Sequence, residues 1–375
     1  MDTLRRLLLL TPLIAVLAAC GSATSTTAPV TDASTAPAAE GAAAATATRQ
    51  PTATVAPTAT PEPVEPGTSR SAPLPLSTEL RFKDWAVVIT DVARGAAAAE
   101  AIAGANQFND PPPEGWQYLL ATLRMTNIST EQEAQSVLFG IDLRVTGDHN
   151  VLYSRASVVV PQPLKGELFP EGSTEGQVAF LVPADERNLM FFVAESLSFD
   201  RDARRFVTID EGASISPDPA LEEIAPTDAG ATRASPAPLG TTAVSADWEI
   251  IVLEVFRGAD AAQRVAEANS FNDPAPEGQE YIVARVRARY LGSDDPDVAA
   301  RIDQNAFKVT GAANVIYERP SVVAPDPQLE ANLFPGGVAE GWVVVQAPVG
   351  EAGLTLVYEP LFEFGNENRR FFGLE

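Results

Sequence analysis

The chain has 375 residues, of which 50 are acidic and 26 are basic, giving a formal net charge of −24. Such a charge repels phosphate backbones and anionic headgroups, which argues against binding to nucleic acid or electrostatically to a membrane. The chain contains one cysteine, Cys20, and one histidine, His149. This excludes an intramolecular disulfide and a zinc site built from cysteine and histidine. The length predicts about two domains with additional chain.

The N-terminus carries a targeting signal. Arg5 and Arg6 precede an apolar run over residues 7–19, which is too short to cross a bilayer core of about 30 Å. The run ends in Leu-Ala-Ala-Cys at Cys20, which resembles the lipobox of bacterial lipoproteins, whose cysteine is acylated after cleavage. The alternative is an ordinary signal peptide with a coincidental cysteine. We predict a lipoprotein signal over residues 1–20, lipidation of Cys20, and export to the outer face of the cytoplasmic membrane or the cell surface.

Residues 21–72 are nearly all Ala, Thr, Ser, Pro and Gly and contain no aromatic residue. A segment without apolar periodicity does not bury enough surface to offset its ordering entropy. We therefore predict a disordered linker that acts as a stalk, with a simple tether as the alternative. Whether its threonines are glycosylated is left open.

An internal repeat follows the linker. "PLSTELRFKDWAVVITDVARGA" from Pro75 matches "PLGTTAVSADWEIIVLEVFRGA" from Pro238, and the same offset of 163 aligns "NQFNDPPPEG" with "NSFNDPAPEG". The offset drifts to 165 by the C-terminal "RRF" at Arg204 and Arg369. This pattern indicates a tandem duplication, with repeat 1 over residues 73–212, a proline-rich linker over 213–237, and repeat 2 over 238–375. The prolines of this linker predict semi-rigid tandem domains with modest contact between them.

Each repeat reads as a β-sandwich. Segments such as "WAVVITDV" and "YLLATLRM" are β-branched or partly alternating, and Gly, Pro, Asn and Asp clusters separate them. One alanine-rich helical pattern, "RGAAAAEAIAGAN" or "RGADAAQRVAEAN", lies between the first and second strands. We predict an all-β chain of two tandem immunoglobulin-like β-sandwich domains, each with one short inserted helix. Trp85 and Trp248 open the first strands and are expected in the cores.

The repeats also resemble a family. The resemblance is carried by four features: the opening "PLG…DW", the strands led by Tyr118 and Tyr281, the "VTG" strands at Leu143 and Phe307, and the "LFPGG" turn at Leu333. They are similar to the telokin-like, immunoglobulin-type domains of unknown function in bacterial surface lipoproteins. The resemblance covers nearly all of both repeats and implies the fold, whereas it says little about function. The "FNDP" segments and the preceding helix look like an elaboration of this family.

The strongest candidate site is the "FNDP" segment, which recurs in both repeats. Asn109 and Asp110, repeated as Asn272 and Asp273, offer oxygen atoms for a repeated ligand or calcium site. The competing interpretation, which we favour, is that these side chains satisfy main-chain groups at a turn while the preceding phenylalanine fills the core.

Other candidates are weaker. Trp116 and Trp342 occur in one repeat each, at positions that hold Gln279 and Gln177 in the other, and are expected to be exposed aromatics at a binding face. The acidic loop at residues 294–297 is expected to be solvated rather than a calcium site, because no EF-hand spacing is present. His149 is expected to be a solvated turn residue, since no partner for a catalytic triad is apparent.

We therefore expect a non-catalytic binding or interaction module without cofactor or metal. Its expected partners are the membrane, through the lipid anchor, and an unidentified protein or glycan of the envelope, but not nucleic acid. Two alternatives remain at this point. The first alternative is a structural spacer. The second is a calcium- or carboxylate-dependent module that acts on an envelope glycan.

Overall fold

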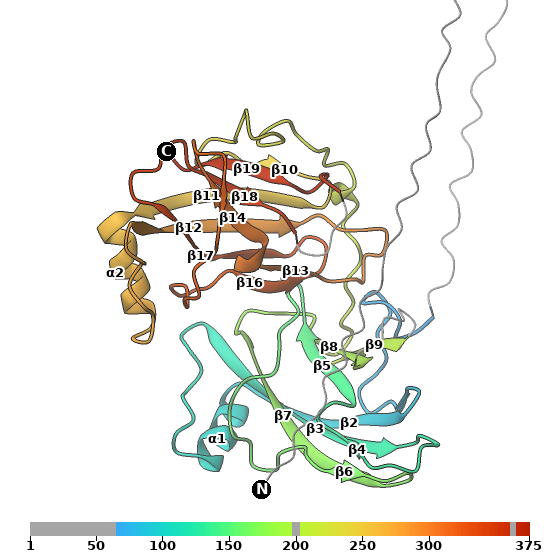
Figure 1. Ribbon diagram of the computed structural model, residues 1–375. Helices are drawn as coiled ribbons and strands as arrows, with labels where there is room; N and C mark the ends of the chain where they lie inside the picture. The colour runs from blue at the N-terminus through green and yellow to red at the C-terminus, as the bar shows by residue number, and fades with distance from the viewer. Residues whose placement is uncertain (1–64, 197–202, 361–364) are drawn as a thin grey trace, which may run out of the picture. The chain divides into compact units, whose positions relative to one another are not determined.

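Strands dominate the computed structural model, which describes residues 65–196, 203–360 and 365–375 (Figure 1). The described residues form two antiparallel β-sandwiches, one in each repeat, and each sandwich carries one α-helix. The predicted fold class is therefore confirmed. The helices lie between the long first and second strands of each repeat, as the sequence predicted.

The sandwich of repeat 1 has the strand arrangement of an immunoglobulin domain. Its sheets have the orders β1-β2-β3-β7 and β5-β8-β9, and β4 pairs only with β6. If β2, β3 and β7 are lettered A, B and E, then β5, β8 and β9 are C, F and G, the two-sheet division of that fold. The elements are β1 (Leu80–Arg81), β2 (Trp85–Arg94), α1 (Ala96–Ala105), β3 (Trp116–Asn127), β4 (Gln135–Ser136), β5 (Ile141–Thr146), β6 (Glu167–Leu168), β7 (Ser173–Pro183), β8 (Met190–Glu195) and β9 (Arg204–Thr208).

Repeat 2 has the same plan. Its sheets are β10-β11-β12-β17 and β15-β14-β18-β19, with a separate β13-β16 pair. The elements are β10 (Ala243–Val244), β11 (Trp248–Arg257), α2 (Gly258–Ala268), β12 (Gln279–Tyr290), β13 (Ala300–Asp303), β14 (Phe307–Thr310), β15 (Ile316–Tyr317), β16 (Glu330–Leu333), β17 (Val338–Pro348), β18 (Thr355–Tyr358) and β19 (Arg370–Gly373).

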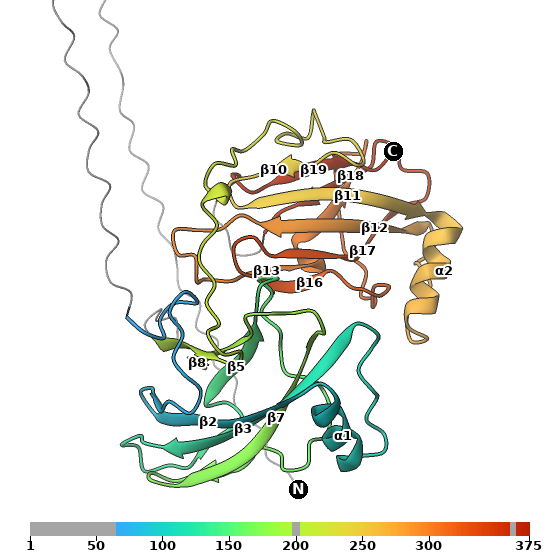
Figure 2. The ribbon, with the colours of Figure 1, turned by 180° about the vertical axis from the view of Figure 1, so that it is seen from behind.

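The first sheet of each sandwich is buried on both faces where the helix covers it. In β3, Leu119 and Leu123 point into the main core, whereas Tyr118 and Leu120 on the other face pack against Ile102 of α1. This explains why residues 118–121 of β3 are all apolar, whereas the rest of the strand alternates. Each helix accordingly lies on the β3–β7 or β12–β17 side of its own sandwich (Figures 1 and 2). Trp85 and Trp248 are 3% and 2% exposed, so their predicted core positions are confirmed.

A glycine makes the turn from strand to helix in both repeats. Gly95 and Gly258 have φ angles of 60° and 57°, a left-handed conformation that other residues adopt at a cost. The turn brings each short helix back over the sheet that it leaves. Packing against that sheet stabilises a helix of 10 or 11 residues, which is marginal in isolation.

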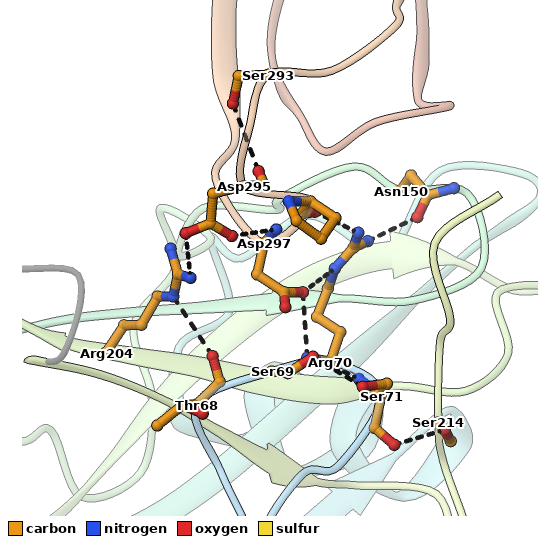
Figure 3. A network of polar contacts seen from close by, with 11 residues as sticks. Thr68, Ser69, Arg70, Ser71, Asn150, Arg204, Ser214, Ser293, Asp295 and Asp297 are labelled. Atoms are coloured by element: carbon orange, nitrogen blue, oxygen red, sulfur yellow. Dashed lines mark hydrogen bonds and ion pairs between the residues drawn. The ribbon is translucent and has the colours of Figure 1, made fainter. Parts of the chain in front are cut away.

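Arg70 links the two repeats (Figure 3). Its main-chain N–H and its Nε donate to Asp297 Oδ1 at 3.1 and 3.0 Å, and its Nη2 donates to the carbonyl of Pro296 at 2.9 Å. Its Nη1 also donates to Asn150 Oδ1 at 2.6 Å. Burial lowers the pKa of the Arg70 guanidinium, and the adjacent Asp297 carboxylate opposes this shift. A second ion pair joins Arg204 Nη2 to Asp295 Oδ2 at 2.6 Å.

Phe334 forms the apolar part of the same interface. Its side chain is fully buried among residues of repeat 1, including Leu152 and Phe206, and its ring centre lies 6.1 Å from that of Phe206. The guanidinium carbon of Arg70 lies 4.0 Å from the centre of the Phe334 ring. Two main-chain hydrogen bonds of 2.8 Å, Leu152 N–H to the Asn332 carbonyl and Phe334 N–H to the Asn150 carbonyl, complete the contact.

These contacts correct three expectations. The acidic loop is solvated only in part, because Asp294 is exposed whereas Asp297 is 7% exposed and pairs with Arg70. The predicted end of the disordered linker at residue 72 is too late, since Arg70 is 2% exposed and belongs to the folded part. The contact between repeats is also more extensive than expected, and the described residues of both repeats belong to a single compact unit.

Candidate functional site

The "FNDP" loop of repeat 1 is clamped to the sandwich by Asn109. The Asn109 Nδ2 donates to the carbonyl of Ile102 at the end of α1 and to that of Val159, both at 2.7 Å. The Val159 N–H donates back to Asn109 Oδ1 at 3.0 Å. Asn106 Oδ1 accepts the N–H of Phe108 at 3.0 Å, so the turn that carries the phenylalanine is held as well.

The loop of repeat 2 repeats these contacts. Asn272 Nδ2 donates to the carbonyls of Val265 and Val323 at 2.7 and 2.9 Å, and Val323 N–H donates to Asn272 Oδ1 at 2.8 Å. Asn269 Oδ1 accepts the N–H of Phe271 at 2.9 Å. The two loops therefore have the same conformation for the same reason.

Main-chain groups thus use both amide donors and the carbonyl oxygen of Asn109 and of Asn272. This geometry favours the turn-satisfying interpretation of the two asparagines over a calcium site. In Asp110 and Asp273 the main-chain carbonyl oxygen, not the side chain, makes the hydrogen bond. It accepts from the hydroxyl of Tyr118 at 3.1 Å in repeat 1 and from that of Tyr281 at 2.9 Å in repeat 2. Both aspartates are exposed.

The phenylalanines of the loops do not fill the core, so that expectation is wrong. Phe108 is 81% exposed and Phe271 is 91% exposed. The reason is that the asparagine, one residue later, faces the sandwich and turns the phenylalanine outwards. The valines that the asparagines clamp, Val159 and Val323, are 46% and 36% exposed. We call Phe108 with Val159, and Phe271 with Val323, the two apolar tips.

Trp342 is buried, so its predicted exposure is wrong. It is 8% exposed and packs under α2, where its ring centre lies 5.8 Å from that of Phe256. The guanidinium of Arg264 on α2 lies 3.6 Å from the Phe256 ring centre and 5.6 Å from the Trp342 ring centre. The corresponding residues of repeat 1 are Ala93, Ala101 and Gln177. Larger side chains at three adjacent positions therefore fill this layer in repeat 2 only.

Trp116 is 40% exposed at the start of β3, as predicted. Its ring lies edge-on to that of Tyr153, with the ring centres 6.3 Å apart. Both residues line an open cleft of about 550 Å³ together with His149, Glu330 and Glu340. The cleft is bounded by residues of both repeats.

His149 lies beside a buried carboxylate. Its Nδ1 is 2.9 Å from Glu186 Oε2, and the Glu186 side chain also accepts the His149 N–H at 2.8 Å and the Tyr153 hydroxyl at 2.6 Å. Burial, followed by this hydrogen bond, raises the pKa of Tyr153. In repeat 2, Glu351 accepts the N–H of Ala313, which aligns with His149, at 2.8 Å. A glutamate that supports the turn with or without the histidine has a structural role.

Within residues 65–196, 203–360 and 365–375, no group of three or more His, Cys, Asp or Glu side chains is arranged to hold a metal ion. In the same part of the chain, no helix has the length and hydropathy needed to cross a membrane. Cys20, the predicted lipidation site, lies outside the described residues.

Comparisons with known proteins give no family assignment. No protein-family model matches the chain, and no curated protein matches it. Solved structures that resemble it include the ycdA protein of Bacillus subtilis, described as a candidate lipoprotein, at 13% identity and a TM-score of 0.27 over 36% of this chain. An uncharacterized β-sandwich protein of Clostridium difficile matches at 8% identity and a TM-score of 0.25, over 40% of this chain and 100% of its own. The matched part spans 38% of the ycdA chain.

Proposed function

We propose that this chain is an exported, lipid-anchored and non-catalytic interaction module that docks on a protein partner through its two apolar tips. The lipobox-like segment ending at Cys20 supports the anchor. The division of strands into A-B-E and C-F-G sheets supports a telokin-like, immunoglobulin-type assignment for both repeats. The docking function rests on the tips alone.

The observation that carries the proposal is the exposure of Phe108 and Phe271 at the same position of two diverged repeats. The rest of the segment is also retained, apart from Gln107 and Pro112, but the retained Asn109 and Asn272 have partners within the fold. A phenylalanine that is 81% or 91% exposed contributes little to the core, whereas a buried one stabilises a fold by roughly 1.5–3 kcal/mol. Its retention in both copies therefore points to a contact outside the chain.

The clamp makes each tip suitable for binding. Because Asn109 and Asn272 fix the loop before any partner arrives, docking orders few additional residues and loses little conformational entropy. Aromatic side chains at the centre of a contact commonly carry most of its binding energy. Two rigid tips on one chain would also allow bivalent attachment.

The charge around the tips favours a protein over a lipid surface. Asp110 and Glu114 are exposed in the loop of repeat 1, as are Asp273 and Glu277 in that of repeat 2. These carboxylates would be repelled by anionic headgroups. A protein surface with apolar pockets and basic residues around them complements the tips in both respects.

The experiment is affinity capture from envelope extracts by residues 20–375 carrying Cys20→Ser. The wild-type sequence should recover a discrete partner, and the double variant Phe108→Ser/Phe271→Ser should recover at least about tenfold less of it. Leu239→Ser, which alters another exposed apolar residue (45% exposed), is the matched control and should behave as wild type. Equal recovery by the double variant would refute docking through the tips, and recovery of no specific protein would favour the spacer alternative.

A second candidate function rests on the cleft at Trp116. An exposed aromatic ring beside carboxylates suits a small ligand such as a saccharide, which agrees with an envelope glycan as the alternative partner. Trp85, Trp248 and Trp342 are all buried, so a ligand in this cleft should alter the fluorescence of Trp116 selectively. The test is to add neutral disaccharides and measure tryptophan fluorescence. The function predicts a change in the wild type that is lost in Trp116→Phe, and no such change would rule it out.

A further inference from the structure

The interface between the repeats consists of two complementary halves. Repeat 2 contributes Phe334 and the carboxylates of Asp295 and Asp297, which we call the plug. Repeat 1 contributes Arg70, Asn150 and Leu152, which we call the socket, and it receives the plug through the contacts shown in part in Figure 3. Because the chain is a tandem duplication, each half has a counterpart in the other repeat.

The counterpart of the plug lies on repeat 1 and is unoccupied. Phe169 in "LFPEG" aligns with Phe334 in "LFPGG" at an offset of 165. Phe334 is fully buried, whereas Phe169 is 65% exposed. The loop of repeat 1 that corresponds to the acidic loop carries Glu131 and Glu133, with the same spacing as Asp295 and Asp297, and both glutamates are exposed.

The counterpart of the socket lies on repeat 2 and is formed in advance. Arg233 aligns with Arg70 at an offset of 163, and Asn314 aligns with Asn150 at 164. The Arg233 guanidinium donates to Asn314 Oδ1 and to the carbonyl of Gly311, and the first of these contacts repeats that of Arg70 with Asn150. The socket geometry thus does not depend on a bound plug.

Exposure separates the occupied socket from the open one. Arg70 is 2% exposed and Leu152 is 6% exposed beneath the plug. Arg233 is exposed, and Ile316, which aligns with Leu152, is 54% exposed. The chain therefore presents an apolar side chain flanked by carboxylates at repeat 1 and a matching apolar site with an arginine at repeat 2.

We propose that copies of this chain associate head to tail, with the Phe169 plug of one copy entering the Arg233 socket of the next. The internal interface supplies the template, and the charges of Glu131 and Glu133 complement that of Arg233. The contact joins two different surfaces, so it does not close on itself and each added copy leaves one plug and one socket free. Because no linker holds the halves together, the contact between chains is weaker than the internal one.

Sedimentation velocity on residues 20–375 carrying Cys20→Ser tests this directly. The wild-type sequence should show a sedimentation coefficient that rises with concentration, up to about 0.5 mM. Phe169→Ser removes the plug and Arg233→Ala removes the socket arginine, and each variant alone should remain monomeric over that range. A mixture of the two variants should form dimers, since it combines one intact plug with one intact socket.

Phe108→Ser is the matched control. It removes a phenylalanine of repeat 1 that is even more exposed than Phe169 (81% against 65%), and its counterpart Phe271 takes no part in the internal interface, so association should be unchanged. A wild-type chain that stays monomeric at about 0.5 mM overturns the proposal. So does association that persists in Phe169→Ser, or a mixture of Phe169→Ser and Arg233→Ala that forms no dimer.

Discussion

Replacing Arg70 with alanine should destabilise the chain strongly. The Arg70 and Asp297 side chains are 2% and 8% exposed, and removing one partner of a buried ion pair costs about 3–5 kcal/mol. Asp297 keeps the hydrogen bond from the main-chain N–H of residue 70, which places the cost near the lower limit. Loss of the guanidinium from the face of Phe334 adds roughly 1–2 kcal/mol. We expect the free energy of unfolding to fall by about 4 kcal/mol.

The chain offers its own control for this variant. Arg233→Ala removes the equivalent arginine of repeat 2, which is exposed, and should change the free energy of unfolding by less than about 0.5 kcal/mol. Urea denaturation of both variants under identical conditions measures the difference. In a double-mutant cycle, Arg70→Ala and Asp297→Ala should be coupled by more than about 2 kcal/mol. If Arg70→Ala and Arg233→Ala are equally mild, the two repeats are not joined as described.

Three further changes give distinct outcomes. Asn109→Ala should lower the unfolding free energy by about 1–3 kcal/mol and speed amide hydrogen exchange in its loop, whereas Asp110→Ala should do neither; equal effects would argue against the clamp. Trp342→Ala should cost about 3–5 kcal/mol in urea denaturation, and a cost typical of a surface residue would contradict its burial under α2. Hydrogen bonds from Lys308 and Arg369 lower the pKa of Glu359 below its ordinary value of 4.5. The stability that the ionised Glu359 contributes is therefore present above pH 4.5 and is lost as the pH falls through the lowered pKa. Thermal melts from acid to neutral pH should therefore show a flatter profile for Glu359→Gln, and an unchanged acid limb would be evidence against this ion pair.

The sandwiches could be predicted because the duplication shows each strand twice. The segments beginning at Trp85 and Trp248 share an apolar pattern despite differing residues, and the helical pattern between the same strands identified both helices. Core positions such as Trp85 follow from the strand pattern. These features depend on residues near one another in sequence, which periodicity can detect.

The interface could not be read from local pattern. Arg70 lies in a segment with the composition of the stalk, and its partner Asp297 is 227 residues away. One signal was nevertheless present. If the repeat alignment is extended upstream, Gly67 and Arg70 match Gly230 and Arg233, which indicates that the folded unit begins before residue 73.

Trp342 and Phe108 differ from their expected positions for two different reasons. The exchange of Trp342 for Gln177 alone suggests an exposed side chain, but Phe256 and Arg264 also replace small residues of repeat 1 beside it. Substitutions that change together mark a packed layer rather than a surface. The outward orientation of Phe108 follows from the Asn109 clamp, whose partner Val159 is 50 residues away, so local sequence does not reveal it.

Site-specific photocrosslinking in cells tests the docking function most directly. A photoreactive p-benzoylphenylalanine would replace Phe108 or Phe271 in the full-length chain, and Leu239 would serve as the control position. The proposal predicts the same protein adduct from positions 108 and 271 and none from position 239. Absence of an adduct at both tips, or an identical adduct at position 239, would contradict the proposal that the apolar tips bind a partner.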